Sequence, residues 1–184
     1  MDFICIELAN TRWSISHKPF SDPLKDIHWI KDFLHRWDFS IDSDISEEQV
    51  KQLDDLRGLI VRVLEEFGRN GEIQQPCIDN LNHYLQRSNL TYIFSKDDST
   101  YRISLKPIEN NWNYVLSKIT TSLIELIANG TIKQMKRCEN PDCRWIFHDE
   151  SKNNSRKWCC NTCASLIKVR KFRQRRELNE KTDT

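Results

Sequence analysis

The sequence has little glycine and proline and no long uninterrupted run of apolar residues. Of the 184 residues, 4 are Gly and 5 are Pro, which excludes collagen-like proteins and chains disordered through Pro and Gly. No window approaches the roughly 18 apolar residues that a membrane-spanning helix requires. The first residues, Met1-Asp2-Phe3, lack the basic and apolar segments of a secretory signal. We therefore expect a cytoplasmic protein with reduced cysteines.

Motifs of the common catalytic and nucleotide-binding sites are also missing. The sequence contains no G-x-S-x-G, P-loop, H-E-x-x-H or dinucleotide fingerprint. The histidines of the first 130 residues are scattered, and each is expected at the surface or hydrogen-bonded in the core. The sequence therefore predicts a protein that is not an enzyme.

Charge is distributed unevenly along the chain. The net charge is +1 overall, but residues 1–131 carry 14 Lys and Arg against 20 Asp and Glu, a net charge of −6. Residues 132–184 carry 14 against 7, a net charge of +7. An acidic body with a basic tail indicates two functional units and an anionic partner for the tail.

Residues 1–130 have the apolar periodicity of a mainly helical domain with one β-hairpin. We expect helices over residues 3–9, from Ser21-Asp22-Pro23 to 37, from a capping box at 46–49 to Gly68 and Gly71, over 76–88 and over 111–129. Residues 90–106 change to a strand pattern on either side of a polar turn at 95–99. The dipeptide Asn129-Gly130 ends this domain, and a second domain covers 131–184.

Three polar residues follow the first apolar run and are candidates for a ligand pocket: Asn10, Thr11 and Arg12. Polar side chains directly after a buried segment can point into a cleft between helices. The alternative is that Asn10 only caps a helix.

Five of the seven cysteines lie in the basic tail. Cys138 and Cys143 form one close pair, and Cys159 and Cys163 form another after fifteen residues. This spacing predicts one structural zinc ion, because Zn²⁺ prefers four tetrahedral ligands and binds thiolates. Cys160 is an alternative to Cys159, and His148 is a further candidate ligand.

The spacing further predicts a treble-clef-like zinc finger. Pro141-Asp142 makes a turn in the first pair, residues 145–158 form a hairpin, and the second pair begins the final helix. Three aromatic residues are expected to pack around the metal: Trp145, Phe147 and Trp158. Four thiolates leave no open position, so the metal folds the module, with an apparent binding energy of about 10–16 kcal/mol.

The final helix is rich in Lys and Arg. Leu166, Val169 and Phe172 recur every third residue and are expected to dock on the hairpin. The cations expected to contact nucleic acid are Arg156, Lys157, Lys168, Arg170, Lys171, Arg173, Arg175 and Arg176. Five phosphate contacts would give a salt slope of about −4.5. The alternatives are a solvated helix or a helix that binds an acidic protein.

The sequence resembles a known family in these motifs. The pattern Cys138-x4-Cys143-x-Trp-x-Phe-x-Asp-x-Ser, then Arg156-x-Trp-Cys159-x3-Cys163 and a basic helix, resembles the CGNR zinc finger. The start, Cys-Ile-Glu-Leu-Ala-Asn-Thr at 5–11, is similar to the opening of the ABATE domain that precedes this finger. The chain departs from the motif that names the family, because Ala-Ser-Leu follows Cys163.

The resemblance implies a stress-induced bacterial transcription regulator. It implies zinc bound by the four cysteines already named, DNA binding by residues 132–180 and a regulatory role for 1–130, which senses a ligand or mediates assembly. Other partners that the sequence leaves open are RNA, an acidic protein and a second copy of the chain. The alternative function is a zinc-stapled interaction adaptor.

Overall fold

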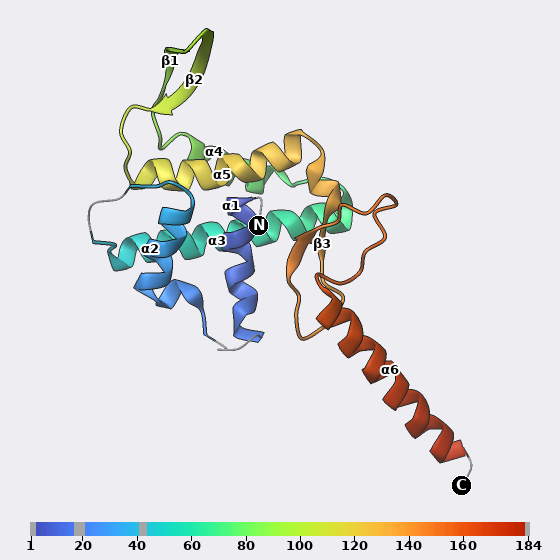
Figure 1. Ribbon diagram of the computed structural model, residues 1–184. Helices are drawn as coiled ribbons and strands as arrows, with labels where there is room; N and C mark the ends of the chain where they lie inside the picture. Colours follow the sequence, from blue (N-terminus) through green and yellow to red (C-terminus); the bar gives the residue numbers. More distant parts are fainter. Residues whose placement is uncertain (1–2, 17–20, 41–43, 183–184) are drawn as a thin grey trace.

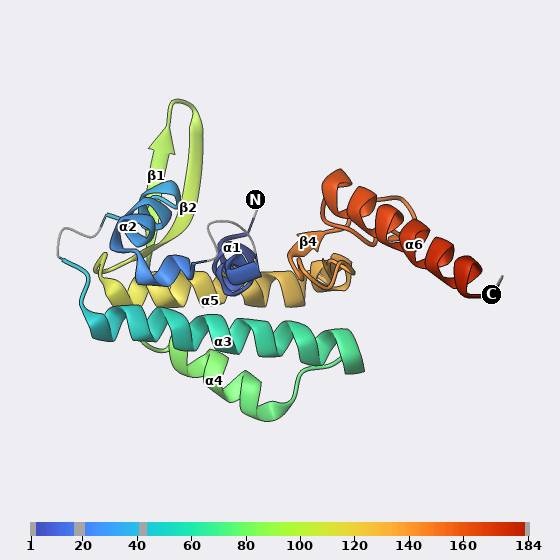
Figure 2. The same ribbon diagram turned by 90° about the horizontal axis from the view of Figure 1, so that it is seen from below.

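The computed structural model describes residues 3–16, 21–40 and 44–182, and it consists of a helical body, a β-hairpin and a C-terminal finger with a long helix (Figure 1). In the body, α1 (Ile4–Asn10) crosses α3 (Glu47–Asn70) and α5 (Trp112–Ala128), which run side by side (Figure 2). Helix α4 (Gln75–Leu85) packs against both long helices. Helix α2 (Ile27–Arg36) follows the 3-10 helix η2 (Pro23–Lys25) in the chain and contacts it. A further 3-10 helix, η1 (Thr11–Ser16), follows α1 directly.

Side-chain caps define the starts of α2, α3 and α5 (Trp112–Ala128). The predicted capping box is present: the Ser46 hydroxyl accepts from the N–H of Gln49, and the Gln49 side chain accepts from the N–H of Ser46. At the start of α5, the side-chain oxygen of Asn111 accepts from the N–H of Tyr114 at 3.2 Å. The helix predicted to start at Ser21-Asp22-Pro23 is divided, because Asp26 has extended backbone angles and caps α2 with its carboxylate.

Glycines end two of the helices. Gly71, with φ 73°, stops α3 in the left-handed conformation, whereas Gly68 lies inside the helix, so the prediction that Gly68 contributes to the stop was wrong. Gly130, with φ 74°, follows α5 and begins η3 (Thr131–Gln134). This is the stop that Asn129-Gly130 predicted.

The core of the body consists of aliphatic side chains from α1, α3 and α5 with Phe33 of α2. A buried cation lies against this core: Arg57 of α3 is 6% exposed. Its guanidinium donates to both carboxylate oxygens of Asp22, at 2.7 and 2.8 Å, and to Asp54. Burial works against the charge, but these hydrogen bonds dominate and lower the pKa of Asp22.

The predicted hairpin comprises β1 (Leu90–Asp97) and β2 (Thr100–Pro107), which pair antiparallel. Its turn contains Asp98 and Ser99, so the strands extend further than the predicted turn at 95–99 allowed. Asp98 has φ 50°, a conformation that Asp tolerates better than most residues. This hairpin, called the β-arm below, projects from the body (Figures 1 and 2).

The finger contains β3 (Met135–Arg137), β4 (Ile146–His148) and α6 (Asn161–Thr182). The two strands pair antiparallel and enclose the first cysteine pair. The hairpin predicted over 145–158 was therefore misplaced: its partner strand precedes Cys138, and residues 149–160 form a loop. Helix α6 extends away from the rest of the molecule (Figure 1).

Strand β4 joins the finger to the body. The side chain of Asn10, 1% exposed, donates to the carbonyl of Ile146 at 2.9 Å and accepts from its N–H at 2.8 Å. Ile146 belongs to the core of the body, while the neighbouring Phe147 packs with the cysteines. Around this contact, Arg137 pairs with Glu65 of α3.

No helix in the described part of the chain combines the length and the apolar character needed to cross a membrane.

Candidate metal centre

The four predicted cysteine ligands lie together. Cys138, Cys143, Cys159 and Cys163 place their Sγ atoms within 4.8 Å of one another. The Sγ of Cys159 lies 3.6 Å from that of Cys143 and 3.8 Å from that of Cys163. Sulfur atoms around a tetrahedral zinc ion, each about 2.3 Å from the metal, are about 3.8 Å apart. The donor set therefore fits one zinc ion.

The first pair lies in a tight turn between β3 and β4. The carbonyl of Asn140 accepts from the N–H groups of Cys143 and Arg144, at 2.9 and 3.2 Å, and its side-chain oxygen accepts from the N–H of Asp142. Arg144 has φ 56°, which lets the chain leave the turn into β4. Cys138 closes the turn by donating its N–H to the carbonyl of Trp145 at 2.8 Å.

The second pair lies at the start of α6. Cys163 is in the first turn of α6, and Cys159 lies two residues before the first residue of this helix, Asn161. The side-chain amide of Asn140, 3% exposed, donates to the Sγ of Cys163 at 3.4 Å. A hydrogen bond to a thiolate stabilises its charge and orients the ligand. Asn140 is a supporting residue that the sequence argument missed, although its place inside the Cys-x4-Cys turn was a signal.

Two of the four thiols, those of Cys143 and Cys159, resist ionisation. Burial raises the pKa of Cys143 to about 12, and burial together with the neighbouring Cys143 raises the pKa of Cys159 as well. A divalent cation favours the thiolate form and offsets both effects. The cluster holds one zinc ion, which cross-links the two chain segments.

The predicted aromatic shell is present. Phe147 is 8% exposed and packs with the cysteines, and Trp145 and Trp158 lie against the same cluster. The guanidinium carbon of Arg156 lies 4.9 Å from the ring centroid of Phe147. Arg156 also donates to the carbonyls of Trp158 and Cys159, so it holds the loop that leads to the second pair.

A buried carboxylate organises this loop. Asp149 is 1% exposed and accepts from the Lys136 ammonium at 2.7 Å and from the N–H groups of Ser151 and Arg156, at 3.0 and 2.8 Å. Burial alone would raise the pKa of Asp149, but these donors hold it far below the usual range. The resemblance motif contained Asp149, but the sequence alone did not reveal this structural role.

The two alternative ligands lie outside the cluster. Cys160 is exposed, and the group of four sulfur atoms does not include it. His148 has its Nε2 2.7 Å from the Oε1 of Gln134 and its Nδ1 3.6 Å from a carboxylate oxygen of Glu150. The ligand set is thus the four cysteines that the spacing favoured.

The cations predicted to bind nucleic acid divide into two groups. Lys157 pairs with Glu139 at 3.5 Å, Arg170 pairs with Asp142, and Arg156 is bound as described above. Four exposed cations of α6 have no acidic partner among the residues whose side chains are described: Lys168, Lys171, Arg173 and Arg175. Arg176 is also exposed and has an interaction within the molecule.

The apolar residues of α6 do not dock on the hairpin. Leu166, Val169 and Phe172 are 47%, 48% and 62% exposed. That prediction was wrong because the strand pair already has partners: Ile146 faces the body and Phe147 faces the metal cluster. Helix α6 therefore exposes its cations and also a stripe of apolar side chains.

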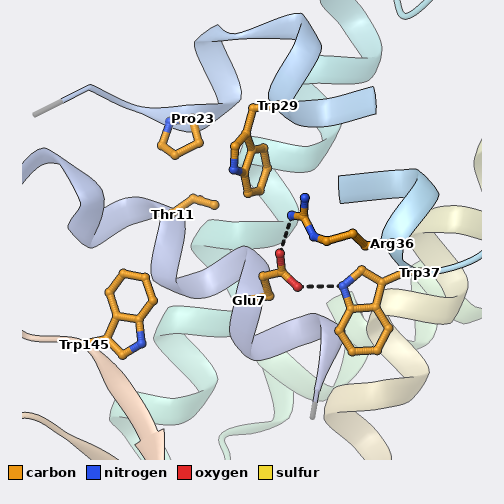
Figure 3. Close-up of a pocket in the computed structure, with 7 residues that line it drawn as sticks. All are labelled: Glu7, Thr11, Pro23, Trp29, Arg36, Trp37 and Trp145. Atoms are coloured by element: carbon orange, nitrogen blue, oxygen red, sulfur yellow. Dashed lines mark hydrogen bonds and ion pairs between the residues drawn. The ribbon is translucent and has the colours of Figure 1, made fainter. Parts of the chain in front are cut away.

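A separate cavity of about 540 Å³ lies between the body and the finger (Figure 3). It is lined by Glu7, Thr11, Pro23, Trp29, Arg36, Trp37 and Trp145. Glu7 accepts from Arg36 at 2.5 Å and from the indole N–H of Trp37 at 2.7 Å. Trp145 lies on the opposite side of the cavity and comes from the finger.

The structure distributes the three predicted pocket residues differently. Thr11 lines this cavity, and its hydroxyl accepts from Arg57 at 3.0 Å. Asn10 instead holds β4, and Arg12 is exposed with its guanidinium carbon 6.0 Å from the ring centroid of Trp13. The junction role of Asn10 was not predicted, since its partner Ile146 is 136 residues away.

Comparison with protein families finds a similarity in the finger. Residues 134–176 match the family model of the CGNR zinc finger. The matched segment contains all four cysteines, β3, β4 and most of α6, and it does not extend into the helical body. No curated protein matches the chain.

Proposed function

We propose that this chain is a zinc-dependent DNA-binding transcription regulator whose α6 binds the phosphate backbone. The observation that carries the proposal is the group of exposed, acid-free cations on α6, next to a four-cysteine zinc site. Its supporting context is a basic tail of net charge +7 beside a body of net charge −6. A helix that is fixed at one end and cationic along its length suits a polyanion.

In this proposal, the metal fixes the position of α6 relative to the rest of the finger. Zinc would hold Cys159 and Cys163 at the start of α6 against Cys138 and Cys143, in a treble-clef-like arrangement. Since four thiolates fill the coordination sphere, the site supplies structure and no catalysis. We therefore propose that the protein is not an enzyme.

The binding residues differ from those that the CGNR motif supplies. The chain has Ala164-Ser165-Leu166 after Cys163, so no arginine follows that ligand in the motif position. Arg156 and Arg170 are engaged inside the finger. We assign the backbone contacts to the four exposed cations that have no acidic partner among the described side chains, and they give an expected salt slope of about −3.6.

The test is fluorescence anisotropy of the full, zinc-loaded protein with random duplex DNA between 50 and 200 mM salt. We expect the triple variant K168E/K171E/R175E to lose DNA retention at low salt while it keeps one zinc per chain. The matched control is the triple variant K51E/K106E/K118E, which reverses three exposed lysines outside the finger and should still bind. Unchanged binding by the first variant would refute the assignment of α6.

The alternative function is a zinc-stapled interaction adaptor. The exposed stripe of Leu166, Val169 and Phe172 favours it, because apolar side chains in a row on a helix suit a protein partner. On DNA, the same side chains would contact sugars and thymine methyl groups. Salt-sensitive capture of an acidic protein, with no shift of DNA or RNA at low salt, would support the adaptor. A shift of RNA alone would support RNA binding.

We propose that the body senses a ligand or mediates assembly. The tryptophan-lined cavity supports the first role, because Glu7 and Trp37 of the body and Trp145 of the finger all line it. A small molecule in this cavity would contact both units at once. A thermal-shift screen, with Trp29→Ala as the variant that should lose the response, tests this role.

A further inference from the structure

The β-arm has one apolar face and one polar face. The register pairs Tyr92 with Leu105 and Phe94 with Ile103, and side chains paired across two strands lie on the same face. The apolar arm face consists of Leu90, Tyr92, Phe94, Tyr101, Ile103 and Leu105, with Lys96 near the tip. The opposite face carries Thr91, Ile93, Ser95, Asp97, Thr100, Arg102, Ser104 and Lys106.

The apolar arm face is uncovered. Tyr92 and Phe94 are each 73% exposed, Ile103 is 69% exposed and Tyr101 is 62% exposed. The rings of Phe94 and Tyr101 stack on each other, with centroids 5.6 Å apart, and the core of the body includes no residue of the β-arm. The described part of the chain therefore supplies no cover for this face.

An apolar hairpin face that is left exposed to water is unusual. An isolated two-stranded hairpin is marginally stable in water, and one apolar face normally packs against another element. Three aromatic side chains that are about two-thirds exposed present about 400 Å², and the three aliphatic side chains bring the face to about 600 Å². Monomeric proteins rarely expose a contiguous apolar patch larger than this.

We propose that a second copy of this chain covers the apolar arm face, so that two β-arms pack face to face in a two-fold symmetric dimer. A stable interface takes about 800 Å² from each partner, and this face provides most of that area. A two-fold interface requires a surface that complements itself. An apolar surface with one charge, at its end, meets this requirement.

Charge supports an antiparallel arrangement of the two arms. Lys96 lies near the tip, whereas the exposed Glu109 follows β2 at the base. In an antiparallel pair, Lys96 of each copy lies beside the base of the other copy, and the two Lys96 ammonium groups are far apart. A parallel pair would bring these ammonium groups together, which costs free energy.

The position of the β-arm is compatible with binding by α6. The arm and α6 leave the molecule at opposite corners in Figure 1 and lie well apart in Figure 2. A dimer through the arms leaves both copies of α6 open at its outer ends. The inference does not depend on nucleic-acid binding, because dimerisation is measured without any ligand.

The test is sedimentation velocity of the full, zinc-loaded chain between 1 and 100 μM. We expect a dimer in the wild type. Phe94→Ser removes one large anchor from each copy, so it should weaken dimerisation about 1,000-fold, since two such anchors are lost per dimer. The matched control, Ile93→Ser on the opposite face of the same strand, should leave the dimer intact.

A second variant guards against local unfolding of the arm. Replacement of residues 90–107 by a short Gly-Ser linker should give a monomer with an unchanged zinc content and an unchanged body, because the core contains no arm residue. A wild-type monomer at 100 μM would overturn the proposal, even if the arm then bound lipid vesicles or another protein. A dimer that persists in both the Phe94→Ser variant and the linker variant would also overturn it.

Discussion

The body and the finger are stabilised by different means. The body buries a continuous set of aliphatic side chains from several helices, whereas the buried cluster of the finger consists of Cys138, Cys143, Cys163 and Phe147. Burial of apolar area stabilises the first by roughly 25 cal/mol per Å². The second is too small for a core of this kind and depends on its metal. One chain thus combines a part stabilised by apolar burial with a part stabilised by a metal ion.

The largest expected effect is that of metal removal. Metal binding in such modules contributes about 10–16 kcal/mol, so a strong chelator at pH 7 should unfold the finger and leave the body folded. Hydrogen exchange measures both, and we expect amides of residues 138–163 to lose protection while those of α3 and α5 keep it. Cys143→Ser should have the same effect without a chelator. Equal loss of protection in α3 would show that the body also depends on the metal.

A smaller effect, confined to the body, is expected from Asp22→Asn. The variant breaks the buried pair with Arg57 and should lower the free energy of unfolding by about 3 kcal/mol at pH 7. Because the pKa of Asp22 is lowered in the folded state, its contribution is present above pH 3.8 and is lost as the pH falls further. Urea unfolding should therefore show a difference from the wild type that shrinks below pH 3.8.

The control for this variant is Asp55→Asn, an exposed acid on α3, which should leave the stability unchanged. Zinc content should be equal in both variants. A loss of zinc in the Asp22→Asn protein would show that the stability of the finger depends on that of the body.

Asn10→Ala tests the junction between the two units. It leaves the N–H and the carbonyl of Ile146 without partners, which should cost about 2 kcal/mol. We expect a lower free energy of unfolding and faster hydrogen exchange of β4, with zinc still bound. Asn82→Ala, an exposed asparagine on α4, is the control. Unchanged exchange at Ile146 would contradict the clamp.

The smallest expected effect is that of Cys160→Ser. This thiol is exposed and lies outside the group of four, so zinc stoichiometry and affinity should equal those of the wild type. Competition with a chromogenic chelator measures both. A tenfold loss of zinc affinity would show that Cys160 takes part in coordination.

Local patterns predicted the elements and the metal site well. Ser46 and Gln49 form the capping box, Gly130 stops α5, and the cysteine spacing gave the ligand set. Each of these features depends on neighbours in sequence or on the fixed chemistry of a metal. The ABATE resemblance of the body and its regulatory role remain predictions.

Features that depend on distant partners could not be predicted. The partner strand of β4 lies before Cys138, because Lys136 and Asp149 meet across the strand pair. The open stripe on α6 followed from the faces of β4 being occupied already. No pattern in the sequence marks Asn10 as the partner of Ile146, because the pairing needs the folded positions of α1 and β4.

Strand β4 contributes side chains to the interior of both the body and the finger. Neighbouring side chains on a strand point to opposite sides, so Ile146 fills the interior of the helical part while Phe147 supports the sulfur cluster. A protein truncated after residue 131 would thus lack the Ile146 side chain that fills part of the core of the body. The Asn10 amide would also lose its hydrogen bonds to the backbone of Ile146. Such a fragment should be less stable and more prone to aggregate than the full chain, although the charge pattern places a division there.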